Sequence, residues 1–204
     1  MNRLLLLCFV LGACGSSDTV SSDEQARRAY LGLDKSIGKS ITLGFDGFNS
    51  ASSANISPQT AMGDKAGMLT VTGQVDQGAS ANKGMRLYVG MVGYTDGPIA
   101  IDDKGHTINV TYDTAASSTD QPYLQMMLMN IPTGTLTGTL NAGTTMTGKY
   151  HLTGDIKGDV ELDLTITGKL MSGPNNTVVR VPGMTHVTGT AVSGDGMYAV
   201  DVTI

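Results

Sequence analysis

The chain has 204 residues, of which 13 are Lys or Arg and 18 are Asp or Glu, so its formal net charge is −5. An acidic balance spread along the chain disfavours nucleic acid and anionic surfaces as partners, and we expect no nucleic-acid partner. Glycine accounts for 27 residues, about twice its ~7% average, but the glycines follow no collagen-like period and 40% of the residues are hydrophobic. This composition is typical of a globular protein.

The N-terminus has the features of a secretory signal. A single positive charge at Arg3 is followed by a short apolar run, Leu4–Leu11. This run is far shorter than the ~20 residues that span a bilayer, and no later stretch approaches that length. The sequence Leu11-Gly12-Ala13-Cys14 resembles the lipobox of bacterial lipoproteins, in which an apolar residue and two small ones precede the acylated cysteine. The resemblance implies that residues 1–13 are a signal peptide and that Cys14 is the lipidated N-terminus of the mature chain.

A lipid on Cys14 would place the protein in the cell envelope, with the membrane as its partner. By resemblance to Gram-negative sorting, Gly15 after the cysteine favours the outer membrane. Each buried methylene contributes ~0.8 kcal/mol, so two or more acyl chains would anchor the protein effectively permanently. Cys8 leaves with the signal peptide and Cys14 carries the lipid, so the mature chain has no thiol for a disulfide, a metal site or a nucleophile.

Residues 14–22 are mostly small and polar and are predicted to form a lipidated tether. A long amphipathic helix is predicted over residues 23–48. Ser22 followed by Gln25 resembles a capping box, which indicates where the helix begins. Apolar or small residues then recur every three or four positions on one stripe: Ala26, Tyr30, Leu33, Ile37, Ile41, Gly44 and Phe48. Three internal glycines each cost about 1 kcal/mol in a helix, so the helix should rely on tertiary packing.

After the helix, residues 49–64 are rich in Ser, Ala and Asn and are predicted to form a loop. The apolar period then becomes two, which predicts these strands: Leu69–Val75, Met85–Thr95, His106–Tyr112, Tyr123–Ile131, Leu136–Leu140, Thr145–Ile156, Val160–Leu170, Thr177–Val181, His186–Val192 and Met197–Ile204. Short turn signals separate the strands and favour antiparallel pairing. We therefore expect residues 23–204 to form a single mostly-β domain.

A short motif recurs along these strands: an apolar residue, Thr, Gly, any residue, and then an apolar or small residue. Its six copies centre on Gly73, Gly138, Gly148, Gly154, Gly168 and Gly189. Strand side chains alternate, so each glycine lies on the inward face with its flanking apolar residues, where it marks a bend or a close approach. We expect a curved antiparallel sheet or open barrel that wraps the long N-terminal helix. A β-sandwich with a peripheral helix is the alternative.

The sequence predicts neither an active site nor a metal site. His106, His151 and His186 are far apart and have no ligand spacing. The alternating acids of residues 159–163 would suit a weak divalent-cation site, but they favour a solvated outer face that blocks edge pairing. Catalytic elbow, phosphate-loop and dinucleotide-binding motifs are absent from the sequence. We expect a protein that is not an enzyme and needs no cofactor.

One predicted strand, Tyr123–Ile131, is apolar on both faces, and a strand of this kind is covered on both sides. In one interpretation Met126, Leu128 and Met129 border an adaptable apolar ligand pocket, because methionine suits promiscuous binding surfaces. In the other, this is a central strand between the helix and a loop. The expected function is that of a non-enzymatic envelope lipoprotein that binds an apolar, lipid-like ligand or an envelope protein. The alternative is a structural or surface-interaction module with a filled core and no small-molecule ligand.

Overall fold

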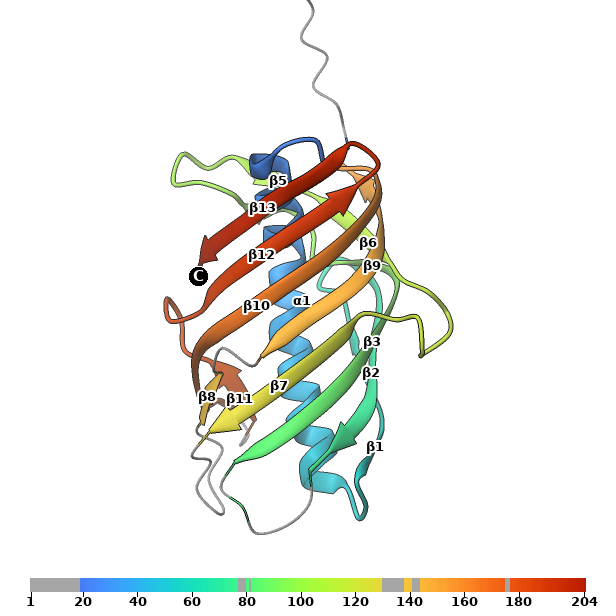
Figure 1. Cartoon of the computed structure of the whole chain (residues 1–204), viewed down its shortest axis with the longest axis vertical. Coiled ribbons are helices and arrows are strands. Elements are labelled where there is room, and N and C mark those ends of the chain that lie inside the picture. Colours follow the sequence, from blue (N-terminus) through green and yellow to red (C-terminus); the bar gives the residue numbers. More distant parts are fainter. Residues whose placement is uncertain (1–18, 77–79, 81, 130–137, 141–143, 175–176) are drawn as a thin grey trace, which may run out of the picture.

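The computed structural model describes residues 19–204 except residues 77–79, 81, 130–137, 141–143 and 175–176 (Figure 1). In residues 127–129 and 138–140 it describes the backbone. The predicted signal peptide, residues 1–13, and the predicted lipidation site Cys14 lie outside the described residues. The described part of the chain is mostly β, with thirteen strands and one α-helix.

Helix α1 spans Asp23–Ser50, which confirms the predicted helix and extends it by two residues. The hydroxyl of the N-cap residue Ser22 accepts a 3.2 Å hydrogen bond from the backbone N–H of Gln25. The side chain of Gln25 in turn accepts a 2.8 Å bond from the backbone N–H of Ser21. The predicted stripe is buried from Ala26 to Gly44. Within the described ranges, no helix combines the length and the hydropathy needed to cross a membrane.

The strands are β1 (Asn55–Met62), β2 (Ala66–Val75), β3 (Lys83–Thr95), β4 (Ile99–Ala100), β5 (Thr107–Ile108), β6 (Val110–Asp113), β7 (Tyr123–Met129), β8 (Gly138–Leu140), β9 (Thr145–Gly154), β10 (Gly158–Ser172), β11 (Val178–Arg180), β12 (His186–Ser193) and β13 (Gly196–Thr203). In the described residues, eleven of them form one antiparallel sheet in the order β1-β2-β3-β6-β9-β7-β8-β10-β12-β13, with β11 paired to β10. Strands β3 and β7, and β9 and β10, also pair directly. Strands β4 and β5 form a separate small sheet.

Strand β1 shows that the prediction of a loop over residues 49–64 was wrong. This edge strand pairs with β2, and its register shifts between Ile56 and Gln59, where Pro58 interrupts the pairing of the strands. Only Ile56 of this strand is buried. A polar edge strand that contains proline lacks the apolar alternation by which strands are recognised.

The predicted strand His106–Tyr112 is divided into β5 and β6. Between the two, the backbone N–H of Asn109 donates a 2.8 Å hydrogen bond to the side chain of Asp155. The carbonyl of Asn109 accepts a 3.0 Å bond from the backbone N–H of Asp155. These two bonds to Asp155 replace strand-pairing hydrogen bonds at Asn109, so β5 ends before β6 begins.

Two of the motif glycines are required by close approach of a neighbouring strand. Gly73 and Gly189 have φ angles of 149° and 151°. A Cβ atom at Gly73 would lie 2.0 Å from the carbonyl oxygen of Arg86, and one at Gly189 would lie 2.1 Å from that of Asp163. Any larger residue would push the paired strands apart, so the recurrence of glycine follows from how closely the strands pack.

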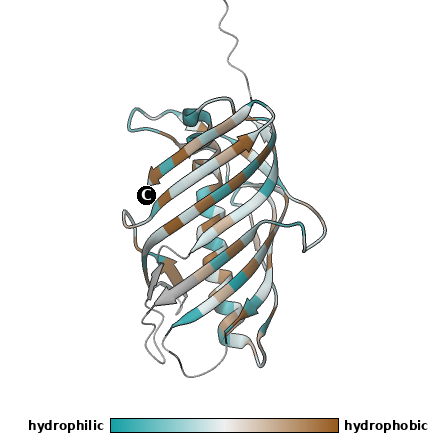
Figure 2. Ribbon diagram, viewed as in Figure 1, coloured by the Kyte–Doolittle hydropathy of each residue, from teal (hydrophilic) through white to brown (hydrophobic). Residues whose placement is uncertain are grey.

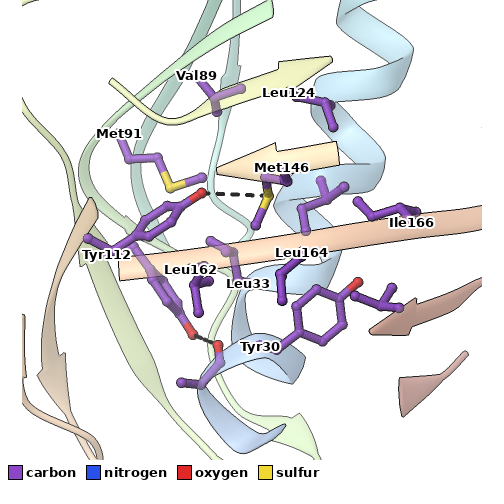
Figure 3. Close-up of a cluster of buried hydrophobic side chains, with 14 of the residues drawn as sticks. Tyr30, Leu33, Val89, Met91, Tyr112, Leu124, Met146, Leu162, Leu164 and Ile166 are labelled. Atoms are coloured by element: carbon purple, nitrogen blue, oxygen red, sulfur yellow. Dashed lines mark hydrogen bonds between the residues drawn. The ribbon is translucent and has the colours of Figure 1, made fainter. Parts of the chain in front are cut away.

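Helix α1 lies against one face of the sheet, with the strands running obliquely to its axis (Figure 1). It contacts β1, β2, β3, β6, β11 and β13. Hydrophilic and hydrophobic residues alternate along the strands (Figure 2), and the hydrophobic ones pack with α1 in a single buried cluster. Figure 3 shows part of this cluster around Tyr30 and Leu33 of the helix. Tyr112 donates a 2.6 Å hydrogen bond to the carbonyl of Ala29, so the interior joins strand to helix by a polar contact as well.

The start of α1 is also bound to β13. The backbone N–H of Ala199 donates a 2.8 Å hydrogen bond to the carboxylate of Asp23, a residue 176 positions earlier. This N–H lies on the edge of β13 that faces away from β12. The helix terminus thus occupies part of a strand edge that would otherwise present unpaired donors.

Candidate functional site

The residues predicted to border a ligand pocket lie on β7. Met126 is fully buried and pairs across the sheet with Met85, inside the hydrophobic cluster. It lines none of the three surface hollows that the structure describes. Leu128 and Met129 are in the described backbone of β7, where Leu128 pairs with Lys83, but their side chains lie outside the description. Ligand binding at these three residues therefore stays a prediction.

A different hollow, which we call the α1 groove, lies between the helix, β1, β11 and the end of β13. Its volume is about 530 Å³. Its walls come from five separate segments, and they are mainly aliphatic. The lining residues are Lys35, Gly38, Lys39, Thr42, Leu43, Ala61, Val179, Arg180, Val181, Pro182, Thr185 and Ile204.

One wall of the α1 groove is fixed to the helix by Arg180. Its guanidinium group makes two 2.7 Å bonds to the two carboxylate oxygens of Asp34, and a third bond of 3.1 Å to the Asp34 carbonyl. Tyr30 donates a 2.8 Å hydrogen bond to the same carboxylate. Burial raises the pKa of Tyr30 well above its ordinary value, and the neighbouring Asp34 raises it further. The phenol therefore stays protonated and remains a donor to Asp34.

Strand β11 is held to α1 by a second bond, from the hydroxyl of Thr42 to the carbonyl of Val178 at 2.7 Å. Gly38 lies beneath Arg180, and a Cβ atom there would be 3.4 Å from a guanidinium nitrogen. These contacts make β11 and the residues after it a rigid wall of the groove.

Lys39, which lines the groove from α1, belongs to an ion-pair network. The Lys39 ammonium group is 2.6 Å from Asp96, 2.8 Å from Asp64 and 3.1 Å from the carbonyl of Met62. It lies 5.3 Å from the centre of the Tyr94 ring, and the Tyr94 hydroxyl donates a 2.8 Å bond to Asp96. Burial acts to lower the pKa of Lys39, but the bonds to the two aspartates outweigh it and the pKa is raised. Lys39 is therefore charged throughout the physiological range.

The charges along the α1 groove compensate one another. Lys35 pairs with Asp64, Lys39 pairs with Asp64 and Asp96, and Arg180 pairs with Asp34. The three cations of the lining are thus paired with three carboxylates, and the rest of the lining is mainly aliphatic. This arrangement favours a neutral, apolar ligand over an anion, because an anion would have to displace an existing carboxylate.

Thr185 contributes a polar atom to the same groove. Its hydroxyl oxygen is buried and is the one such side-chain atom, in the part of the chain that the structure describes, without a hydrogen-bond partner. A buried hydroxyl without a partner costs about 1–3 kcal/mol.

The histidines form pairs on the outer surface. His106 is 2.6 Å from Asp102, His151 is 2.7 Å from Asp159, and His186 is 2.8 Å from Asp201. All three pairs are solvent-exposed. Among the described residues, no three His, Cys, Asp or Glu side chains gather as a metal ion would require.

The α1 groove could not be found from sequence patterns. Its walls meet only because β11 is bound to the middle of α1 and the end of β13 lies beside it, and no local motif encodes these contacts. Comparisons of the chain with protein-family models, curated proteins and solved structures found no match. The lining of the groove is therefore the basis for any proposal about what it could bind.

Proposed function

We propose that this protein is a lipid-anchored, non-enzymatic protein of the bacterial cell envelope that binds an apolar ligand in the α1 groove. The observation that carries the proposal is the groove itself. Its volume of about 530 Å³ falls within the ~300–1,000 Å³ of small-molecule sites, and its lining is mainly aliphatic with a few fixed polar groups.

The anchor in this proposal is a lipid on Cys14, and its location is the outer membrane. The support is the lipobox-like sequence that ends at Cys14, together with the short apolar run before it. Two acyl chains bind a bilayer strongly enough to hold a domain permanently at the membrane. The proposed role requires neither a cofactor nor a nucleic-acid partner.

The same proposal includes the finer architecture, in which the sheet curves around α1 as an open barrel. It is supported by the contacts of α1 with both edge strands of the sheet, β1 and β13. Buried residues on α1 also extend beyond the predicted stripe, to Leu31, Ser36 and Phe45. In this arrangement the helix closes the opening between the two edges, and the α1 groove is the part of that opening which stays unfilled.

A second candidate is a structural or surface-interaction module with no small-molecule ligand. The filling of the interior by α1 and the strands favours it, since Met126 lies within that packing. An envelope protein is then the partner. The two candidates differ in whether the α1 groove binds a small molecule.

The experiment is to purify the chain from Gly15 onward without detergent, and to measure its mass by native mass spectrometry and its binding of a fluorescent fatty acid. We expect a retained hydrophobic molecule or saturable probe binding. The variant Ala61→Trp should fill the groove and weaken probe binding by about tenfold, whereas Ala66→Trp, on the exposed start of β2, should not. A ligand-free mass without saturable binding would support the interaction module instead.

A further inference from the structure

The chain enters the domain at a fixed point, beside the turn between β12 and β13 (Figure 1). Thr19 donates a 2.6 Å hydrogen bond to Asp195 in that turn, and Ser193 donates a 2.5 Å bond to the carbonyl of Val20. The side chain of Val20 is buried in the hydrophobic cluster. Residues 19 and 20 therefore belong to the folded domain, at the end where α1 begins.

This fixed entry point limits how far the domain can stand from a lipid on Cys14. Five peptide units separate Cys14 from Thr19, and a fully extended chain of that length spans at most about 18 Å. With Cys14 in the bilayer, as the proposed function has it, the β12–β13 turn has to lie within that distance of the lipid surface.

An apolar pair is exposed at this same turn. Val192 and Met197 are direct cross-strand partners on either side of it, and they are 37% and 68% exposed. Single exposed apolar residues are ordinary on a protein surface. Here two of them lie side by side, at the end of the molecule that the tether holds closest to the membrane.

The charges around this pair indicate which lipids it suits. Glu161 of β10 is the exposed cross-strand neighbour of Val192 and pairs with Lys149 of β9 at 3.7 Å. Asp195 lies in the turn itself, and Lys157 precedes Gly158, which lies beside Thr19. Asp23 lies beside Ala199 of β13. The three carboxylates outnumber the two lysines in this region, so the surface favours zwitterionic over anionic headgroups.

We infer that the β12–β13 turn is a membrane-contact surface, with Val192 and Met197 inserted among zwitterionic lipid headgroups. This inference rests on the lipid anchor of the proposed function. The inference also gives the distance between the membrane-contact surface and the α1 groove. The groove is lined by residues of the stretch Lys35–Leu43, which lies 12–20 residues along the helix from Asp23, or roughly 18–30 Å. The groove then lies about that far along the helix from the headgroups, and we expect its ligand to reach it through the aqueous phase.

The test uses the full-length, lipidated protein in zwitterionic vesicles, with an environment-sensitive fluorophore on Met197→Cys. Once Cys14 is acylated the introduced thiol is the only one in the mature chain. Met62→Cys is the matched control: Met62 is 65% exposed, and its carbonyl is bound by Lys39, 16 residues and roughly 24 Å along the helix from Asp23. We expect blue-shifted emission, and quenching by nitroxide lipids at a depth of ~5–10 Å, for the Met197 probe and not for the Met62 probe.

Three results would overturn the inference. The first is emission typical of water from the Met197→Cys probe on protein that is acylated and bound to vesicles. This result would leave the proposed anchor and the α1 groove unaffected. The second is a blue shift already present without vesicles that grows with protein concentration, which would assign the surface to a second copy of the chain. The third is a chain that takes up no fatty acid and does not sediment with vesicles, which would remove the anchor as well.

Discussion

Tyr112 lies directly over Gly32 of the helix. A Cβ atom at Gly32 would be 2.4 Å from the Tyr112 hydroxyl oxygen, which is fully buried and bonded to the carbonyl of Ala29. The tyrosine cannot move aside without losing this bond, so glycine is required at position 32 for the approach of helix to strand. The sequence led us to expect that each internal glycine lowers the stability of the helix. The close approach of Tyr112 explains why a glycine is present at this position.

The variant Gly32→Ala should be less stable than the parent protein by about 1–2 kcal/mol. Overpacking costs about 1–3 kcal/mol, and the better helix propensity of alanine returns at most about 1 kcal/mol. Urea unfolding followed by circular dichroism measures the difference. Gly38→Ala is the control, because a Cβ atom there would be 3.4 Å from the guanidinium of Arg180, and it should leave stability unchanged or raise it.

Replacing Arg180 with leucine should destabilise the protein by up to about 3 kcal/mol, because it leaves the Asp34 carboxylate, which is 19% exposed, without its cationic partner and with the hydrogen bond from Tyr30. The matched control is Arg86→Leu, which breaks an exposed pair with Asp76 and should cost at most about 1 kcal/mol. Thermal unfolding of the two variants tests the difference. Equal losses would mean that the Arg180 pair does not hold β11 to the helix.

Acid should weaken the ion pairs that Asp64 makes with Lys35 and Lys39, two residues that line the α1 groove. Hydrogen bonds from Lys35 and then from Lys39 lower the Asp64 pKa from 3.8 to about 2. A lowered folded-state pKa gives stability that is present above pH ~4 and is lost as the pH falls toward 2. The Asp64 side chain is 45% exposed, so solvent screening limits the contribution to about 1 kcal/mol.

The variant Asp64→Asn tests this acid dependence. It should lower the free energy of unfolding at pH 6 by about 1 kcal/mol. Between pH 4 and pH 2 the stability of the variant should fall less steeply than that of the parent protein. Urea unfolding at a series of pH values measures both slopes. Parallel curves would show that the pair contributes nothing to folding.

The variant Cys14→Ser should abolish lipid attachment. We expect a longer, unprocessed or soluble product that takes up no radioactive fatty acid, whereas the parent chain is labelled. Labelling that survives the substitution would place the anchor at another residue. Cys8→Ser is the control, since Cys8 lies within the predicted signal peptide and its loss should leave labelling unchanged.

Local patterns predicted most of the secondary structure. The spacing of apolar residues in α1 and the cap at Ser22 predicted the helix to within two residues. Most strands from β2 onward follow the alternation of residues whose inner face meets the core, which is a physical requirement on each strand alone. The two-residue strand β4 was not predicted, and β5 and β6 were predicted as one strand. Strand β1 was not predicted because Ile56 is its one buried residue, so it lacks an alternating apolar pattern.

The candidate site depends on relations between distant residues, which such patterns do not contain. Arg180 and Asp34 are 146 positions apart, and Lys39 and Asp96 are 57 apart. Nothing in the local sequence of Asp34 distinguishes it from a solvated helix residue. A charge on a predicted polar face becomes a buried partner only when the fold brings another element across it.

The bond between Ala199 and Asp23 has a consequence for the order of folding. It joins the first turn of the helix to β13, across 176 positions of sequence. A chain whose native contacts span such separations folds slowly, in about milliseconds to seconds. The apolar stripe of α1 is made first, and its contacts with β13 cannot form until β13 has been synthesised. We expect the start of the helix to stay exposed until that last strand is in place.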